Sequence, residues 1–139
     1  MTEPVYQAFL GTWVLDPTTC RYEQGEPPRA DRHRIEADGD DLVITMDSTD
    51  AGGEDHHVSF RAPANGQEIP FNAGPLADTL CLTLPSPHEL HLSASCDGLE
   101  LMTATRTLDA DGTTLHLVQT VHLPDFTAPA NRATYRKVA

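Results

Sequence analysis

The chain has 139 residues, which is the length of one domain and too short for two independent hydrophobic cores. Its 21 acidic residues outnumber 9 lysines and arginines, and the formal net charge of -12 argues against nucleic acid or an anionic membrane as a partner. No apolar run approaches the roughly 20 residues that span a bilayer. Because Met1–Leu10 lacks the basic and apolar regions of a secretory signal, we expect one cytoplasmic domain over residues 1–139.

Short segments rich in Thr, Val, Leu and Ile recur along the chain between clusters of Gly, Pro, Asp and Asn, which predicts β-strands throughout. No segment combines a period of 3.6 residues with helix caps, so any helix is at most a turn or two. The expected strands are Phe9–Leu15, Arg32–Ala37, Asp41–Asp47, His56–Ala62, Gln67–Phe71, Thr79–Leu84, Glu89–Cys96, Leu99–Leu108, Thr113–Leu123 and Asn131–Val138.

The turn chemistry between these strands predicts their register. Asp97-Gly98 suits a two-residue type I′ hairpin, which sets Leu92 opposite Thr103 and Leu90 opposite Thr105. Because side chains alternate between the two faces of a strand, these aliphatic and threonine side chains share one face. The charged and polar side chains then share the other face, which we expect to meet solvent.

A second hairpin continues the same faces. Ala110-Asp111-Gly112 suits a three-residue loop with glycine in the left-handed conformation, and it sets Thr103 opposite Gln119. The same register puts Leu101 and Leu117 inside. It puts Arg106 outside, opposite Glu89 on the neighbouring strand. A buried Gln119 amide would be satisfied by threonine hydroxyls and a water, or would orient the polar end of a ligand.

Two further turns agree with an antiparallel meander. Asn65-Gly66 would pair Phe60 with Phe71, and Asp38-Gly39 would set His33 on the same face as Ile44. A meander of eight to ten strands with one apolar face must hide that face, and the chain offers no helices as a cover. The sequence therefore predicts an all-β, antiparallel, up-and-down barrel whose small inward side chains leave a cavity.

The first strand contains Gly11-Thr12-Trp13, which resembles the Gly-x-Trp signature of the lipocalin and fatty-acid-binding (calycin) barrels. The pattern from that signature through Asp111-Gly112 to Tyr135-Arg136-Lys137-Val138 resembles small bacterial lipocalin-like proteins. The resemblance implies a barrel that encloses a small hydrophobic or amphipathic ligand.

The resemblance also implies roles for particular residues. Trp13 would plug the base of the barrel, with a basic residue of the last strand over it, Arg136 being the better candidate and Arg132 the alternative. The Arg-x-Tyr pair by which fatty-acid-binding proteins hold a carboxylate is absent, because Ala133 stands where that arginine would be, two residues before Tyr135.

Histidines and cysteines offer fewer constraints. His33 and His56 share faces with apolar residues, so we expect both to point inward near the ends of the barrel, either as buried neutral imidazoles or as catalytic or gating groups. The spacing of the other histidines and of the acidic residues predicts no metal site, and no cofactor motif occurs. Three widely spaced cysteines indicate reduced thiols, with one disulfide and a spare thiol as the alternative.

We therefore expect non-catalytic binding of a small hydrophobic molecule inside the barrel, by a monomer or homodimer without nucleic-acid or membrane partners. A small enzyme of isomerase or cyclase type and a protein-interaction module are the alternatives, and no catalytic residue is assigned. The expected ligand contacts are Phe60, Phe71, Leu101, Leu117, Thr103, Thr105, Gln119, Tyr135, His33 and His56.

Overall fold

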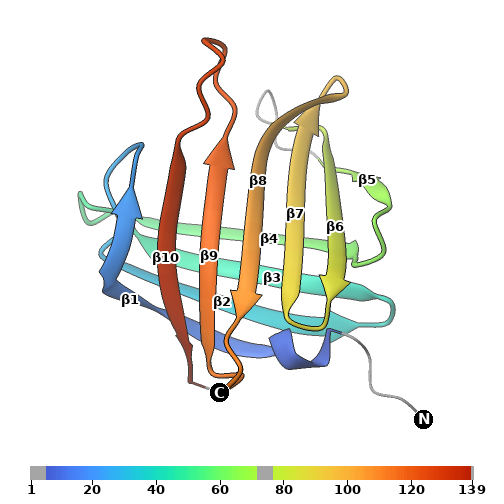
Figure 1. The fold of residues 1–139 in the computed structure, drawn as a ribbon, viewed down its shortest axis with the longest axis horizontal. Helices are drawn as coiled ribbons and strands as arrows, with labels where there is room; N and C mark the ends of the chain where they lie inside the picture. Colours follow the sequence, from blue (N-terminus) through green and yellow to red (C-terminus); the bar gives the residue numbers. More distant parts are fainter. Residues whose placement is uncertain (1–5, 72–76, 139) are drawn as a thin grey trace.

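The computed structural model describes residues 6–71 and 77–138, so the first five residues of Met1–Leu10, where no signal sequence is expected, lie outside the described part. The chain forms a short 3₁₀ helix, η1 (Gln7–Phe9), and ten strands (Figure 1). The strands are β1 (Gly11–Tyr22), β2 (Ala30–Asp38), β3 (Asp41–Thr49), β4 (Asp55–Pro63), β5 (Glu68–Pro70), β6 (Thr79–Ser86), β7 (Glu89–Cys96), β8 (Leu99–Leu108), β9 (Thr114–Val121) and β10 (Ala130–Lys137).

All ten strands belong to one antiparallel sheet in the order β4-β3-β2-β1-β10-β9-β8-β7-β6-β5. In Figure 1 the strands β6 to β10 cross over β2, β3 and β4, while β1 bends from one layer into the other. β4 approaches β6, so the sheet curls into a nearly closed barrel. The prediction of an all-β, up-and-down barrel is confirmed. No helix within the described residues is long and apolar enough to cross a membrane.

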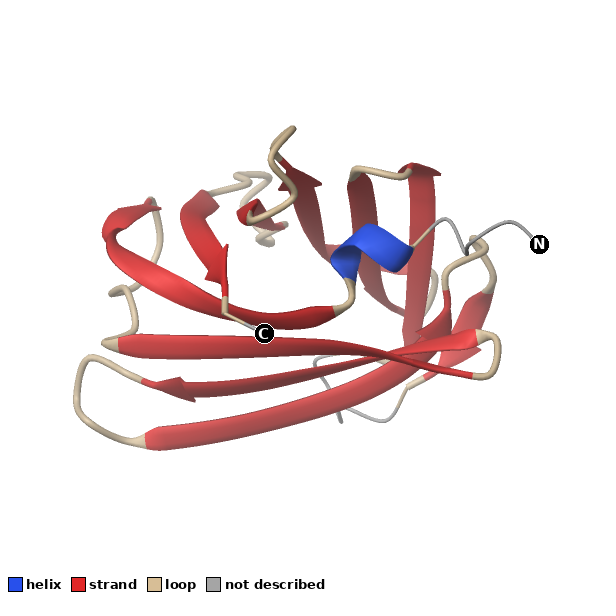
Figure 2. Ribbon diagram, turned by 90° about the horizontal axis from the view of Figure 1, so that it is seen from below, coloured by secondary structure: helices blue, strands red, loops and turns tan. Residues whose placement is uncertain are grey.

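The barrel is plugged at one end and open at the other. At the plugged end Trp13 and Phe9 are both 0 % exposed, and the Trp13 Nε1–H donates to the Phe9 carbonyl at 3.0 Å. Figure 2, seen from below, shows η1 lying at this end. At the other end, residues that face inward by register are exposed, including Gln119 and Val58. Solvent therefore reaches the inner face at the open end.

The basic residue over Trp13 is Lys137, so the expectation for Arg136 is wrong. The Lys137 Nζ lies 5.7 Å from the centroid of the Trp13 ring, and the two residues are direct partners across the β1–β10 ladder. Arg136 precedes Lys137 by one residue and therefore points to the opposite face. Its guanidinium donates to the Thr114 hydroxyl at 3.2 Å and lies 3.6 Å from Asp16.

The register of β8 differs from the expected one because the β7–β8 pair contains a bulge. The hairpin starts as predicted with Cys96 opposite Leu99, but the pairing then shifts, and Ala94 lies opposite Met102. Leu101 is the extra, unpaired residue, and from there on every side chain of β8 is turned to the other face. The β8–β9 connection is also longer than expected, which sets Leu108 opposite Leu115.

Two other turns depart from the expectation without changing faces. Ile35 pairs with Ile44, so the β2–β3 turn is centred later than Asp38-Gly39. β4 and β5 occupy opposite ends of the strand order and form no hairpin ladder, although the Phe60 and Phe71 rings still meet edge to face at 6.3 Å. Cys20, Cys81 and Cys96 are free thiols.

Candidate functional site

A cluster of polar side chains lies inside the barrel, where three strands contribute to it. Asp31 and His33 come from β2, Arg106 from β8 and Tyr135 from β10. Because side chains alternate between the two faces of a strand, His33 shares the inner face of β2 with Ile35, and Arg106 shares that of β8 with Ala104 and Leu108. Arg106, for example, lies between Leu90 and Leu117 in the neighbouring strands, and both leucines are buried.

Asp31 is the acceptor at the centre of this cluster. The Tyr135 hydroxyl donates to Asp31 Oδ2 at 2.6 Å, and His33 Nε2 lies 3.0 Å from the same oxygen. The His33 and Tyr135 rings pack against each other with centroids 4.5 Å apart. Asp31 Oδ1 is buried and has no hydrogen-bond partner among the described residues. One oxygen of the carboxylate is thus saturated while the other is free to accept.

Arg106 is the unusual member of the cluster. Its side chain is only 2 % exposed, yet no carboxylate contacts the guanidinium within the part of the chain that the structure describes. Nη2 lies 3.5 Å from His33 Nδ1 and 3.8 Å from the Met46 sulfur, while Nε and Nη1 have no partner among the described residues. A buried charge without a partner is costly and is usually found at functional sites.

Burial sets the protonation of the neighbouring rings. Desolvation lowers the pKa of His33, and the nearby Arg106 charge acts in the same direction, against the opposing hydrogen bond to Asp31. Desolvation also raises the pKa of Tyr135, and the adjacent Asp31 charge raises it further. Both rings are therefore neutral near pH 7, and the charges of the cluster are those of Arg106 and Asp31.

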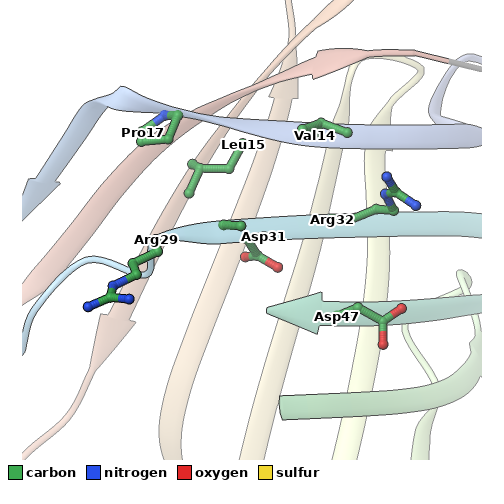
Figure 3. A pocket seen from close by; sticks show the side chains of 8 residues that line it. Val14, Leu15, Pro17, Arg29, Asp31, Arg32 and Asp47 are labelled. Atoms are coloured by element: carbon green, nitrogen blue, oxygen red, sulfur yellow. The ribbon is translucent and has the colours of Figure 1, made fainter. Parts of the chain in front are cut away.

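A surface hollow between β1 and β2 touches this cluster at Asp31. The two strands pair only from Gly11–Ile35 to Val14–Arg32, after which β1 continues along β10 and leaves β2. The resulting gap forms a hollow of about 500 Å³, a size typical of small-molecule sites. Figure 3 shows its lining side chains: Val14, Leu15, Pro17, Arg29, Ala30, Asp31, Arg32 and Asp47.

The inward orientation expected for Thr103 and Thr105 is wrong. Thr103 pairs with Ser93 and Thr120, and both threonines line a hollow on the outside of the barrel. The bulge at Leu101 is the physical reason, because it turns Ala104 and Arg106 inward in their place. Leu101 itself is half-buried and lines an outer hollow at the open end.

Gln119 does face inward, but its surroundings differ from those expected. It lies opposite Ala104 and Asn131, not Thr103, and it is exposed at the open end of the barrel. A buried amide that needs internal partners is therefore not present at this position.

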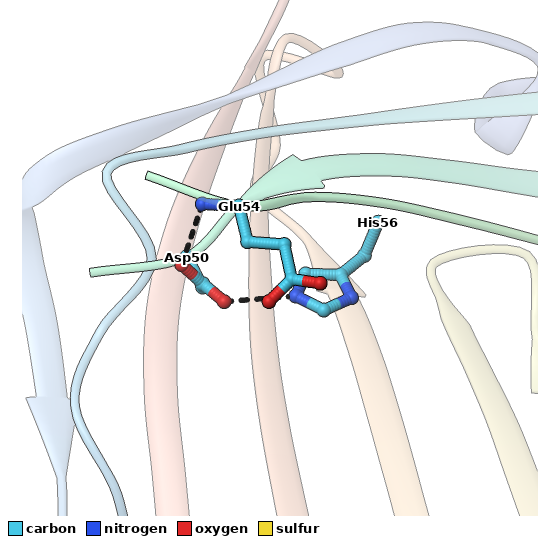
Figure 4. Close-up of side chains that lie close together, drawn as sticks. All are labelled: Asp50, Glu54 and His56. Atoms are coloured by element: carbon cyan, nitrogen blue, oxygen red, sulfur yellow. Dashed lines mark hydrogen bonds and ion pairs between the residues drawn. The ribbon is translucent and has the colours of Figure 1, made fainter. Parts of the chain in front are cut away.

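His56 shares the inward side of β4 with Val58 by register, but it is exposed to solvent and not enclosed by the barrel. It stands at the tip of the β3–β4 hairpin, where its Nε2 lies 2.9 Å from Asp50 Oδ2 (Figure 4). This hydrogen bond raises the pKa of His56. Glu54 is close enough that the three side chains place potential metal-ligating atoms within 4.8 Å of one another. Because exposed acidic groups often gather without a metal ion, this grouping alone assigns no site.

The remaining predicted contacts do reach the inner face. His33, Tyr135, Phe60 and Leu117 are buried there, and Phe71 packs against the core while partly exposed. Of these, only His33 and Tyr135 meet in the polar cluster.

The sequence interpretation missed Asp31 and Arg106. Asp31 stands two residues before His33 on an alternating strand, which is a usable signal for a shared face. Arg106 carries no comparable signal, since the expected register placed it outside.

Known structures share this fold. No protein-family model and no curated protein sequence match the chain. Among solved structures, zebrafish ileal bile acid-binding protein complexed with cholic acid has a TM-score of 0.59 at 17 % identity, over 94 % of this chain and 99 % of that one. Apo lipid binding protein 8 of Caenorhabditis elegans has a TM-score of 0.64 at 12 % identity, over 95 % and 96 % of the two chains. At these identities the likeness shows the fold, and the predicted antiparallel up-and-down barrel is confirmed.

Proposed function

We propose that this barrel binds a small molecule with an apolar body and a polar end, and that it does so without catalysis. The observation that carries the proposal is the buried Arg106 guanidinium, whose Nε and Nη1 lack protein partners within the described residues. A donor buried without an acceptor destabilises the fold, so its presence inside the barrel is best accounted for by a molecule that supplies the acceptor.

The hollow between β1 and β2 supports the same proposal. Val14, Leu15 and Pro17 give it an apolar wall, and Asp31 gives it a polar end that belongs to the Arg106 cluster. Apolar contact would supply most of the affinity, at roughly 25 cal/mol per Å² of buried surface. We retain Phe60, Phe71, Leu117, Gln119 and Tyr135 as proposed contacts on the inner face. The two similar structures are named for bile acid and lipid binding, which agrees with an apolar ligand.

A catalytic role for His33 has less support. Its Nε2–H donates a hydrogen bond to the Asp31 carboxylate, and its Nδ1 faces the Arg106 guanidinium. No imidazole lone pair is therefore left to take a proton from a substrate.

The experiment is titration with N-phenyl-1-naphthylamine, an uncharged fluorophore that brightens in apolar surroundings. We expect saturable binding that Ala30→Trp weakens at least about tenfold, because Ala30 lines the hollow and indole would fill it. Ala37→Trp is the matched control, since Ala37 is an exposed residue of the same strand outside the hollow. Absence of saturable binding, or equal affinity in both variants, would refute the proposal.

A further inference from the structure

The polar cluster contains buried hydrogen-bond donors and a buried acceptor that have no partner among the described residues. Arg106 Nε and Nη1 are donors without an acceptor, and Asp31 Oδ1 is an acceptor without a donor, among the residues that the structure describes. A guanidinium has only donors and a carboxylate only acceptors, so Arg106 needs an acceptor and Asp31 needs a donor. Whatever satisfies both must offer an acceptor to Arg106 and a donor to Asp31.

His33 is an example of a group that accepts from Arg106 and donates to Asp31. Its Nδ1 faces Arg106 Nη2 and its Nε2 faces Asp31 Oδ2, so the neutral imidazole joins the cation to the anion. In the ring, the acceptor and the donor are two nitrogens attached to one carbon. The oxygen and nitrogen of a primary amide are likewise attached to one carbon, with the oxygen accepting and the nitrogen donating. An amide can therefore pair with the atoms that His33 leaves free.

The charge of the cluster favours an uncharged group over a carboxylate. The Arg106 cation and the Asp31 anion balance each other, and the Tyr135 hydroxyl is already committed to Asp31. A ligand carboxylate would add a second buried anion near Asp31, and burial of an uncompensated charge is strongly unfavourable. An uncharged ligand leaves the balance as it is.

We infer, on the basis of the proposed function, that the ligand's polar end is an uncharged group with both a donor and an acceptor, of the carboxamide class, held between Arg106 and Asp31. Its carbonyl oxygen accepts from the free guanidinium N–H groups, and its N–H donates to Asp31 Oδ1. Its apolar body extends into the hollow between β1 and β2.

The test compares lauramide, laurate and methyl laurate, which share one alkyl chain, as displacers of N-phenyl-1-naphthylamine at pH 8. We expect lauramide to bind at least about tenfold more tightly than either of the others. Methyl laurate has an acceptor but no donor, so it measures what the Asp31 contact adds. Laurate binding as tightly as lauramide, or more tightly, would overturn the inference, and so would equal affinity for lauramide and methyl laurate.

Two variants then locate the effect. Asp31→Asn removes the anion and should shift the preference toward laurate, because Arg106 is then the only charge in the cluster. Arg106→Met should weaken the binding of lauramide and of methyl laurate alike, because both carbonyl oxygens accept from the guanidinium that the substitution removes. An unchanged preference in Asp31→Asn together with an unchanged lauramide affinity in Arg106→Met would place the polar end elsewhere and overturn the inference. If the fluorophore itself fails to bind the unaltered protein, the proposed function fails; if it binds and lauramide is not preferred, only the head-group inference fails.

Discussion

The Nη2 atom of Arg106 lies 3.5 Å from the Nδ1 atom of His33. Because a guanidinium donates and never accepts, Nδ1 must be the acceptor and the imidazole proton must reside on Nε2. That proton points to the Asp31 carboxylate at 3.0 Å. A ring held in this way is neutral in the folded protein, and protonation at Nδ1 would place a second positive charge against Arg106.

The stability of the protein should therefore fall as the pH drops below about 6.5, the ordinary pKa of histidine. Burial lowers the pKa of His33 in the folded state, so the unfolded chain takes up its proton first. Stability rises with pH wherever the unfolded state binds more protons, and for His33 that window runs from its lowered pKa up to about 6.5. Urea denaturation between pH 5 and pH 8 measures the slope. His33→Gln should flatten it, and an unchanged slope would show that other groups produce it.

His56 should contribute with the opposite sign. Its hydrogen bond to Asp50 raises its folded-state pKa, so the stabilisation is fully present below about 6.5 and is lost as the pH rises through the raised value. His56→Gln should therefore reduce the urea midpoint at pH 6 and leave it unchanged at pH 9. The effect should be small, because the pair is exposed to solvent. A loss of equal size at both pH values would show that the charge on His56 is not its cause.

Replacing both charges of the cluster, Arg106→Met together with Asp31→Asn, should stabilise the fold. The double substitution removes a buried guanidinium that lacks a carboxylate contact among the described residues, and with it the carboxylate that balances its charge. Replacement of buried ionic groups by uncharged ones of similar volume is often neutral or stabilising, and we expect a gain of about 1–2 kcal/mol in the free energy of unfolding. Arg132→Met is the control on an exposed arginine and should change it by less than about 0.5 kcal/mol. A clear loss in the double variant would mean that the two charges support the fold.

The parts of this structure that follow from the sequence are those where alternation of side chains acts without interruption. On β2 the pattern of His33 and Ile35 identifies the inner face, and both residues are buried there. The same holds for Tyr135 on β10, whose cross-strand neighbours Leu15 and Leu115 are also buried. Along these strands, once one residue is assigned to a face, alternation assigns all the remaining residues to theirs.

The orientation of the side chains of β8 could not be predicted from the sequence, because it depends on one extra residue in the β7–β8 pair. Asp97-Gly98 forms the predicted turn, but the bulge at Leu101 reverses the faces of the rest of β8. Nothing in the composition of Leu99–Leu108 marks the bulge, because threonines and an arginine suit either face. His33 and Tyr135 of the candidate site could therefore be predicted from the sequence, whereas the expected register placed Arg106 on the outer, solvent-facing side.

The corrected register of β8 makes a direct prediction about Thr105. In the structure Thr105 lies on the outer face opposite His91 and Val118, so Thr105→Lys should change the free energy of unfolding by less than about 0.5 kcal/mol. In an uninterrupted hairpin the same lysine would be buried between leucines and would cost about 3 kcal/mol or more. Ala133→Lys is the matched substitution on the inner face, where Ala133 is 6 % exposed, and it should incur that larger loss. Urea denaturation of both variants decides between the registers, since the bulged register requires the two losses to differ and the uninterrupted one requires them to be alike.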